Sequence, residues 1–198
     1  MKVLDMVGYH RKDMGGSASK RLRAKGLAPC VLYGGGQENV HFSVPMILFR
    51  DLVYTPEVAF VNMDIEGTEY RCILQDIQFH PVSEMILHAD FLLLQDDKPV
   101  RMNIPVRFVG SSPGLLKGGK LVAKKRKLKV EALPGNMPSD IEVSVEGIEL
   151  GESVKVRSIN QSGFTILDND SVPVVSVMVP RALRSAQSKG EGEASIAE

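Results

Sequence analysis

Short runs of alternating apolar and polar residues, separated by frequent turn residues, constrain the fold of this 198-residue chain more than any other feature. Val61, Met63 and Ile65 alternate with polar residues, Glu66-Gly67 supplies a turn, and residues 70–79 return as a second strand, which is a hairpin pattern. Only two helices are clear, one before Gly26 and one after Pro45. The pattern predicts mostly-β domains, either a barrel or a sandwich. Further strands are expected at residues 2–10, 29–33, 86–94, 100–109, 121–133, 141–145, 154–156 and 172–179.

Capping and turn residues predict where the helices begin and end. Ser17 or Ser19 is expected to cap the first helix, and Gly26 is expected to end it. Pro45 is expected at or near the first position of the second helix. Residues 110–120 contain four glycines and a proline, so we expect a long loop there.

The chain divides at the polar segment 95–99 (Gln-Asp-Asp-Lys-Pro), which predicts one domain over residues 1–94 and another over residues 95–180. The segment 181–198 is rich in Ser, Gly, Glu and Ala and is expected to be a disordered tail. The first domain carries 9 Lys and Arg against 11 Asp and Glu, and the second carries 12 against 10.

Composition limits the classes of function. The formal net charge is zero, so any contact with nucleic acid must come from a local patch. The N-terminus has no apolar signal sequence and no run is long enough to span a membrane, so we expect a cytoplasmic protein. Cys30 and Cys72 stand in strand-like segments without a Cys-x-x-Cys pair, which predicts buried free thiols and no metal site. No cofactor-binding motif is present, and no cofactor is expected.

The first helix is strongly basic. Lys20, Arg21, Arg23 and Lys25 fall within six positions, and no carboxylate occurs from Ala18 to Gln37. Such a run is often only a solvated helix face. A second interpretation is that it contacts RNA phosphates, with Tyr33 at the end of the next strand against a base or ribose.

A second polar group follows in Gln75-Asp-Ile-Gln78-Phe-His80-Pro81 and His88-Ala-Asp90-Phe91. Three interpretations are open. The histidines and aspartates could form a metal or acid–base site, although their spacing fits no known metal pattern. They could be structural, with His80-Pro81 shaping a turn and Asp90 orienting a neighbour. The glutamines, His88 and Asp90 could also read base edges or ribose hydroxyls from adjacent strands. A hydrolase using His88, Asp90 and Cys72 is a further alternative, but no oxyanion motif accompanies it.

These motifs together resemble the family of bacterial large-subunit ribosomal proteins number twenty-five, which bind 5S ribosomal RNA. The resemblance is carried by Ser19–Arg23, Pro29–Gly34 and the two polar motifs above, in that order and spacing. In the second half, Ile104-Pro-Val-x-Phe108 and Gly118-Gly119 resemble the extended "CTC" form, also known as a general stress protein. The remaining matching positions are Leu133-Pro134, Ile141 and Leu150-Gly151.

The resemblance implies a six-stranded closed barrel with two short helices, followed by a second mostly-β domain. It implies a non-catalytic structural constituent of the large ribosomal subunit, monomeric within the ribosome. The barrel would dock on the loop E region of 5S rRNA, and large-subunit RNA and ribosomal proteins would be its neighbours. A stress-induced factor that joins only some ribosomes is the alternative. The RNA-binding residues implied by position are Arg11, Ser19, Lys20, Arg21, Arg23, Tyr33, Gln75, His88 and Asp90.

The sequence departs from the family pattern at two positions. Phe79 and Gly16 stand where arginine and lysine are common, so two cations are missing from the predicted interface. Arg21 is an ambiguous member, because it could instead pair with a carboxylate of the protein. A run of basic residues in the second domain could compensate by contacting other RNA or a ribosomal neighbour. This possible secondary RNA contact consists of Lys124, Lys125, Arg126 and Lys127.

Overall fold

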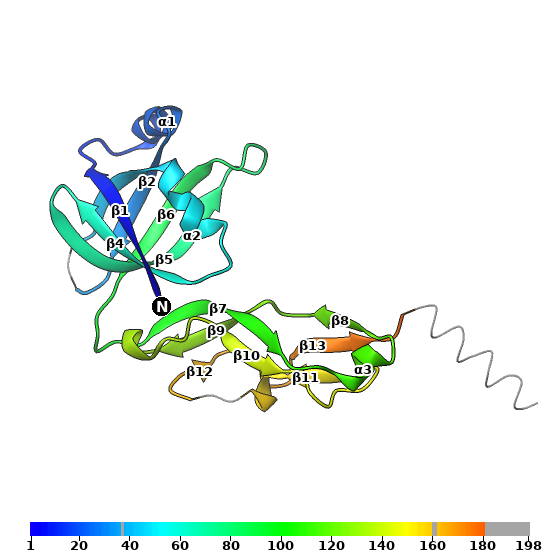
Figure 1. The fold of residues 1–198 in the computed structure, drawn as a ribbon. Coiled ribbons are helices and arrows are strands. Elements are labelled where there is room, and N and C mark those ends of the chain that lie inside the picture. The colour runs from blue at the N-terminus through cyan, green and yellow to red at the C-terminus, as the bar shows by residue number, and fades with distance from the viewer. Residues whose placement is uncertain (37, 160–161, 181–198) are drawn as a thin grey trace, which may run out of the picture. The chain divides into compact units, whose positions relative to one another are not determined.

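The computed structural model describes residues 1–36, 38–159 and 162–180 (Figure 1). The chain divides into two compact units. The first contains Met1–Ile104 and Glu131–Ser139, and the second contains Pro105–Val130 and the chain from Asp140 onward. The expected disordered tail, 181–198, lies outside the described residues.

The N-terminal strands form a closed six-stranded barrel, which confirms the expected architecture. Around the barrel the strand order is β1-β3-β2-β6-β5-β4. β1 pairs with β4 and β2 pairs with β6 in parallel, whereas the other neighbours are antiparallel. Closure leaves the barrel with no continuous free sheet edge. The strands are β1 (Lys2–His10), β2 (Leu27–Tyr33), β3 (Val40–Pro45), β4 (Ala59–Ile65), β5 (Thr68–Phe79) and β6 (Ile86–Leu93).

The hairpin predicted around Glu66-Gly67 is confirmed. Ile65 of β4 pairs with Thr68 of β5, so the turn contains only the two intervening residues. Both have positive φ, 51° for Glu66 and 91° for Gly67, as a type I′ turn requires. Its twist matches that of the flanking strands.

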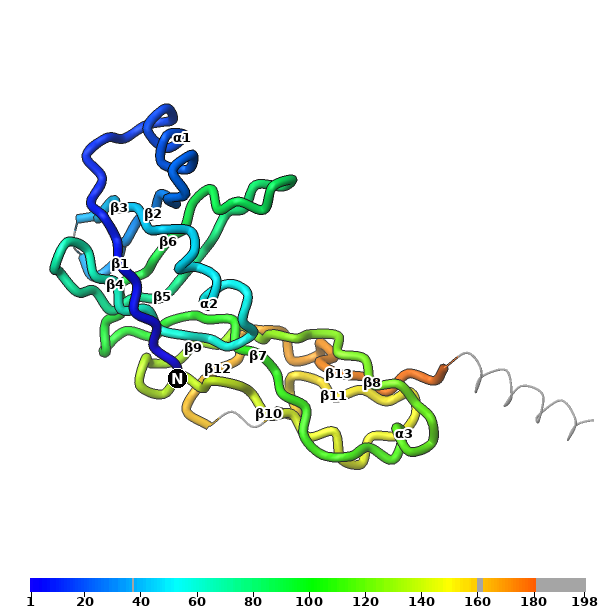
Figure 2. Tube along the Cα trace, turned by 45° about the horizontal axis from the view of Figure 1, so that its top comes forward, coloured from blue at the N-terminus to red at the C-terminus, as the bar shows by residue number. Residues whose placement is uncertain are grey.

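Two helical segments accompany the barrel strands. α1 (Gly16–Ala24) lies outside the barrel beside β2, as Figures 1 and 2 both show. The segment after Pro45 is a 3₁₀ turn, η1 (Met46–Phe49), that continues into α2 (Arg50–Val53). Phe49 of η1 is fully buried and packs against Phe91 in the barrel core.

The C-terminal half is also mostly β and contains two sheets, with orders β10-β7-β9-β12 and β11-β13-β8. Its inward residues are largely aliphatic, and Leu128, Val130 and Val174 have no exposed surface. The elements are β7 (Val100–Val109), α3 (Pro113–Leu116), β8 (Lys120–Ala123), β9 (Lys127–Ala132), η2 (Pro134–Asn136), β10 (Ile141–Ser144), β11 (Ser153–Lys155), η3 (Val156–Ser158), β12 (Thr165–Ile166) and β13 (Pro173–Met178).

Three predictions for this half were wrong in detail. The strand expected over 121–133 is two strands, because the backbone changes partners between them. The N–H groups of Lys124 and Lys125 both donate to the carbonyl of Val174, whereas the carbonyl of Arg126 accepts from Val106. The loop expected over 110–120 contains the one-turn helix α3, which begins at Pro113. A third prediction, the strand over 154–156, was shifted by one residue, since β11 covers Ser153–Lys155 and Val156 begins η3.

Gly119, which follows α3, has no room for a side chain. An added Cβ would lie 2.6 Å from the Gly114 carbonyl oxygen and from side-chain carbons of Leu150 and Val177. We therefore expect Gly119→Ala to lower the free energy of unfolding by about 1–3 kcal/mol through overpacking. Denaturant unfolding of the full chain measures this. Gly135→Ala is the matched control, because nothing lies within 4 Å of its added Cβ. Equal stability of the two variants would contradict the prediction.

Candidate nucleic-acid interface

α1 begins after a glycine N-cap rather than at the predicted serine cap. Gly15 is the N-cap residue, with φ 104°, and no side chain caps the helix. Ser19 lies inside the first turns, where its Oγ donates to the Gly15 carbonyl at 3.0 Å. The expected cap at Ser17 or Ser19 is therefore wrong, because the helix starts one turn earlier than a Ser19 cap requires. Gly26 follows the helix with φ 76°, which confirms the predicted end.

One face of α1 is buried and the other presents cations. Ala18 is 5% exposed and Leu22 is half-buried, so the apolar side faces the barrel. Lys20 and Arg21 are exposed on the remaining surface. Arg23 is half-buried, and its Nε donates to the carbonyl of Leu87 in β6 at 3.0 Å. Arg23 thus fixes the helix to the strand that also carries His88 and Asp90.

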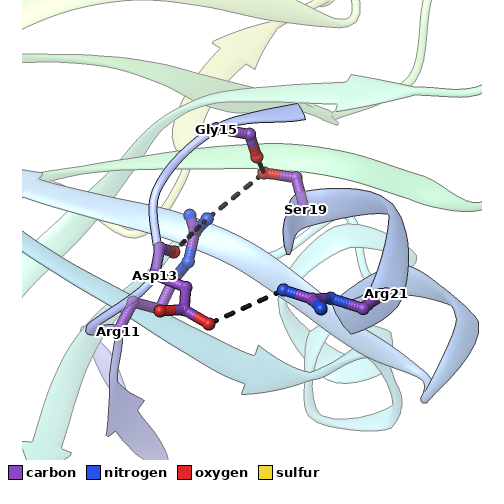
Figure 3. Close-up of polar contacts among 5 residues, drawn as sticks. All are labelled: Arg11, Asp13, Gly15, Ser19 and Arg21. Atoms are coloured by element: carbon purple, nitrogen blue, oxygen red, sulfur yellow. Dashed lines mark hydrogen bonds and ion pairs between the residues drawn. The ribbon is translucent and has the colours of Figure 1, made fainter. Parts of the chain in front are cut away.

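The segment between β1 and α1 is held by side-chain contacts of Arg11 and Asp13 (Figure 3). Arg11 Nη2 donates to Ser19 Oγ at 3.2 Å and to the Asp13 carbonyl at 3.4 Å. Arg21 Nη2 lies 3.6 Å from Asp13 Oδ2, which is the pairing that the sequence left open for Arg21. Both partners of this ion pair are more than two-thirds exposed, so the pair contributes little stability and is readily exchanged for an external anion.

An open groove of about 550 Å³ lies between the end of β1 and α1. Four of its lining residues are Lys or Arg and only one is acidic. Within the described residues, Arg11 Nε is buried beside it without a hydrogen-bond partner. Lys25 belongs to the basic run of the sequence and Lys12 lies upstream of it, but neither is among the predicted RNA-binding residues. The charged and titratable residues of the groove are His10, Arg11, Lys12, Asp13, Arg21 and Lys25.

The predicted polar residues lie on three adjacent strands, β2, β6 and β5. In register, Val31 of β2 neighbours Asp90 of β6, and Gln78 of β5 neighbours His88. Tyr33 is half-buried at the end of β2. Gln75 is exposed at an irregularity in β5, where the pairing with β6 shifts. The structure therefore brings together the residues of both predicted polar motifs.

His88 and Asp90 form the closest polar contact on this surface. His88 Nδ1 lies 2.6 Å from Asp90 Oδ1, and both side chains are about one-third exposed. Asp90 orients the ring, as the structural interpretation predicted. Asp76 lies opposite Asp90 in the register. Partial burial raises the pKa of Tyr33, and the charges of Asp90 and Asp76 raise it further, so its hydroxyl remains a donor.

The hydrolase and metal-site alternatives find no support in the geometry. Cys30 and Cys72 are free and buried, as predicted. Cys72 lies in the barrel core, where burial raises its thiol pKa to about 12, so it is not a nucleophile at neutral pH. In the described part of the chain, no three His, Cys, Asp or Glu residues are placed to hold a metal ion. Within the same ranges, no helix is both long and apolar enough to cross a membrane.

Comparison with known proteins gives a consistent classification. The profile of the Ribosomal L25p family matches residues 6–91, and that of the Ribosomal protein TL5, C-terminal domain, matches residues 99–181. Similar proteins named large ribosomal subunit protein bL25 occur in Cytophaga hutchinsonii, with 48% identity covering 94% of this chain and 97% of the relative, and in Amoebophilus asiaticus, with 48% identity covering 98% of each. The protein from Porphyromonas gingivalis is 39% identical and covers 96% of this chain and 99% of its own length.

The family models and the names of the relatives place the chain in the class of structural ribosomal proteins rather than enzymes. The chain belongs to the ribosomal L25p family, as its resemblance predicted. Membership of this family makes it a structural ribosomal protein, and the ribosome is cytoplasmic.

Proposed function

We propose that the protein is a structural constituent of the large ribosomal subunit that binds the loop E region of 5S rRNA through α1 and the β2-β6-β5 face. The name of its relatives supports the large subunit as the assembly. We propose residues 1–94 as the RNA-binding domain and residues 95–180 as a second domain that reaches other ribosomal components. The protein would act as a monomer within the ribosome.

The observation that carries this proposal is the hydrogen bond from Arg23 Nε to the Leu87 carbonyl. It joins the basic helix to the strand immediately before His88, so cations and polar groups lie on one continuous surface. An RNA helix laid across that surface can place phosphates near α1 and base edges near β6. Two kinds of contact on one surface are typical of recognition by both charge and shape.

The cations of the site are divided between internal and external contacts. Lys20 is exposed and has no ion pair in the described ranges, so it is the simplest phosphate contact. Arg21 can exchange Asp13 for a phosphate. Arg11 and Ser19 hold each other, and Arg11 retains an unpartnered Nε. The groove residues Lys12 and Lys25 extend the same basic surface.

The strand face is suited to bases and ribose rather than to phosphates. Asp76 and Asp90 are neighbours there, and two carboxylates repel a phosphate. Asp90 is an acceptor that fits amino and hydroxyl donors, such as guanine N2 and the ribose 2′-OH in a minor groove. Tyr33 supplies a donor, and Gln75 and Gln78 supply both kinds of group.

A titration of the full chain against intact 5S rRNA and a loop-E-deleted 5S rRNA, each at two salt concentrations, tests the proposal. We expect tight, salt-sensitive binding to the intact RNA and much weaker binding to the deleted one. Equal affinity for the two RNAs would overturn the assignment of the site. If neither RNA is bound, the two cations that are missing from the interface at Gly16 and Phe79 would account for the lost affinity of the barrel for isolated RNA.

Removing a polar group of the strand face should reduce selectivity. We expect Asp90→Asn to lower the ratio of affinities for 5S rRNA and a random RNA duplex about tenfold, because an acceptor is lost and His88 loses the partner that orients it. Glu69→Gln is the control, since it makes the same charge change at an exposed position of β5. Competition titrations measure the ratio. An equal change in both variants would mean that only net charge matters.

A further inference from the structure

A second group of cations lies where the chain crosses from β8 to β9. Lys124 and Arg126 are exposed in the short crossover between the two strands. Lys127 and Lys129 are exposed on β9 and alternate with the buried Leu128, so they lie on its solvent face. We call Lys124, Arg126, Lys127 and Lys129 the crossover patch.

Lys125, at the centre of this run, is not part of the patch. Its Nζ forms an ion pair with Asp168, which is only 18% exposed. Asp168 also accepts the backbone N–H of Lys129 at 3.0 Å. Partial burial works to raise the pKa of Asp168, but its hydrogen bonds with Lys125 and Lys129 and the positive charges of both residues outweigh this and lower it. The carboxylate thus neutralises the one cation that is turned into the protein.

Few carboxylates pair with the cations of the crossover patch. In the described ranges, Lys124, Arg126 and Lys127 form no salt bridge. Nearby on the same sheet, Arg107 of β7 neighbours Glu142 of β10 in the register, so those two charges offset each other. A chain with no net charge therefore concentrates three cations without a salt bridge, with Lys129 beside them, along one short segment. Such a concentration favours a polyanionic partner.

We propose that the crossover patch is a second RNA-binding surface, which contacts the phosphate backbone of ribosomal RNA other than 5S rRNA. Lys127 and Lys129 are alternate residues on one face of β9 and therefore lie about 6.6 Å apart, which is close to the separation of successive phosphates along an RNA strand. Lysine is depleted in protein–protein interfaces but is a common phosphate ligand. The patch is rich in lysine, which favours RNA over an acidic protein partner.

The test compares the full-length chain with the variant Lys124→Ala/Arg126→Ala/Lys127→Ala in binding to the long RNA of the large subunit from which 5S rRNA has been removed. We expect the slope of log affinity against log salt to fall by about two to three units, because three phosphate contacts are lost. The control variant Lys98→Ala/Lys117→Ala/Arg157→Ala removes the same charges from other exposed positions. It is expected to retain the slope.

An equal loss in the two triple variants, or no binding of the long RNA by the unmodified chain, would overturn the proposal. Retained RNA binding with lost incorporation into reconstituted subunits would also overturn it and would indicate a protein partner. Binding of intact 5S rRNA is measured in parallel and is expected to be unchanged. The proposal for the crossover patch can therefore be overturned while the proposed function of the barrel stands, and the reverse is also possible.

The ion pair between Lys125 and Asp168 leads to a prediction about stability. Because the pKa of Asp168 is lowered in the folded state, its contribution to stability is present above the pKa of an ordinary carboxyl group and is lost as the pH falls through the folded value. We expect Lys125→Met to lower the denaturant midpoint at neutral pH, and the difference from the unmodified chain to shrink in acid. A difference that is constant with pH would show that the ion pair is not responsible.

Discussion

Replacing Phe91 by Ala is expected to lower the free energy of unfolding of the barrel by about 3–5 kcal/mol. Phe91 has no exposed surface, and its ring lies 5.8 Å from that of Phe42 and 6.1 Å from that of Phe49. The substitution removes apolar area and leaves a cavity that strands of a closed barrel cannot easily collapse to fill. Since domains are typically stable by only about 5–15 kcal/mol, this loss is a large part of the total.

Hydrogen exchange of the β2, β5 and β6 amides in the full chain measures this effect in the barrel itself. Phe91→Leu keeps most of the volume and should lose much less stability. Phe79→Ala is the matched control, because that ring is 37% exposed at the end of β5. If Phe79→Ala and Phe91→Ala accelerated exchange equally, the aromatic cluster would not be the centre of the barrel core. Because His88 and Asp90 lie on the same strand as Phe91, this core also positions the proposed RNA-binding face.

Features set by neighbouring residues could be predicted from the sequence. Glu66-Gly67 allows only a tight turn between two alternating runs, and Gly26 provides the backbone conformation with which α1 ends. The turn at His80-Pro81 also followed from local sequence, and its geometry is fixed by His80 Nδ1, which accepts the N–H groups of Val82 and Ser83. In each case the interactions that determine the structure lie within a few residues of one another.

Features that depend on distant partners could not be predicted from local patterns. The parallel pairing of β1 with β4 closes the barrel, but nothing in residues 2–10 specifies a strand at residues 59–65 as the neighbour. The alternation of apolar and polar residues alone did not decide between a barrel and a sandwich. The prediction of a closed barrel came from the family resemblance. The interruption of the expected strand 121–133 at Lys124–Arg126 also depends on distant partners, because these residues bond to Val174 and Val106.

The candidate site also combines features that local sequence predicted with features that depend on distant partners. The sequence motifs identified the polar residues of β2, β5 and β6, and the structure places them on neighbouring strands. The motifs did not show that Arg11 and Ser19 are engaged with each other, or that Lys125 is paired with Asp168. A cation in a basic run is equally charged in either role, so only the folded structure separates those that face solvent from those that stabilise the protein.

Arg23→Ala is expected to weaken binding of 5S rRNA by about 10- to 100-fold, the largest effect of any single cation of α1. Its guanidinium combines two functions. Nε donates to the Leu87 carbonyl and holds α1 against β6, whereas Nη1 and Nη2 have no partner in the described ranges and can meet a phosphate. The substitution therefore removes a phosphate contact and also loosens the helix from the strand face.

Lys20→Ala and Arg23→Lys separate these two functions in the same salt titration. Lys20 is exposed and its side chain makes no hydrogen bond or ion pair with the described residues, so its removal should lower the salt slope by about one unit and weaken binding only severalfold. Arg23→Lys retains the charge but not the planar Nε–H donor, so it should keep the slope and still lose affinity. If Arg23→Ala behaved like Lys20→Ala, the hydrogen bond to Leu87 would contribute nothing to recognition. The helix and the strand face would then bind RNA as independent surfaces, because the contact that joins them would be without consequence.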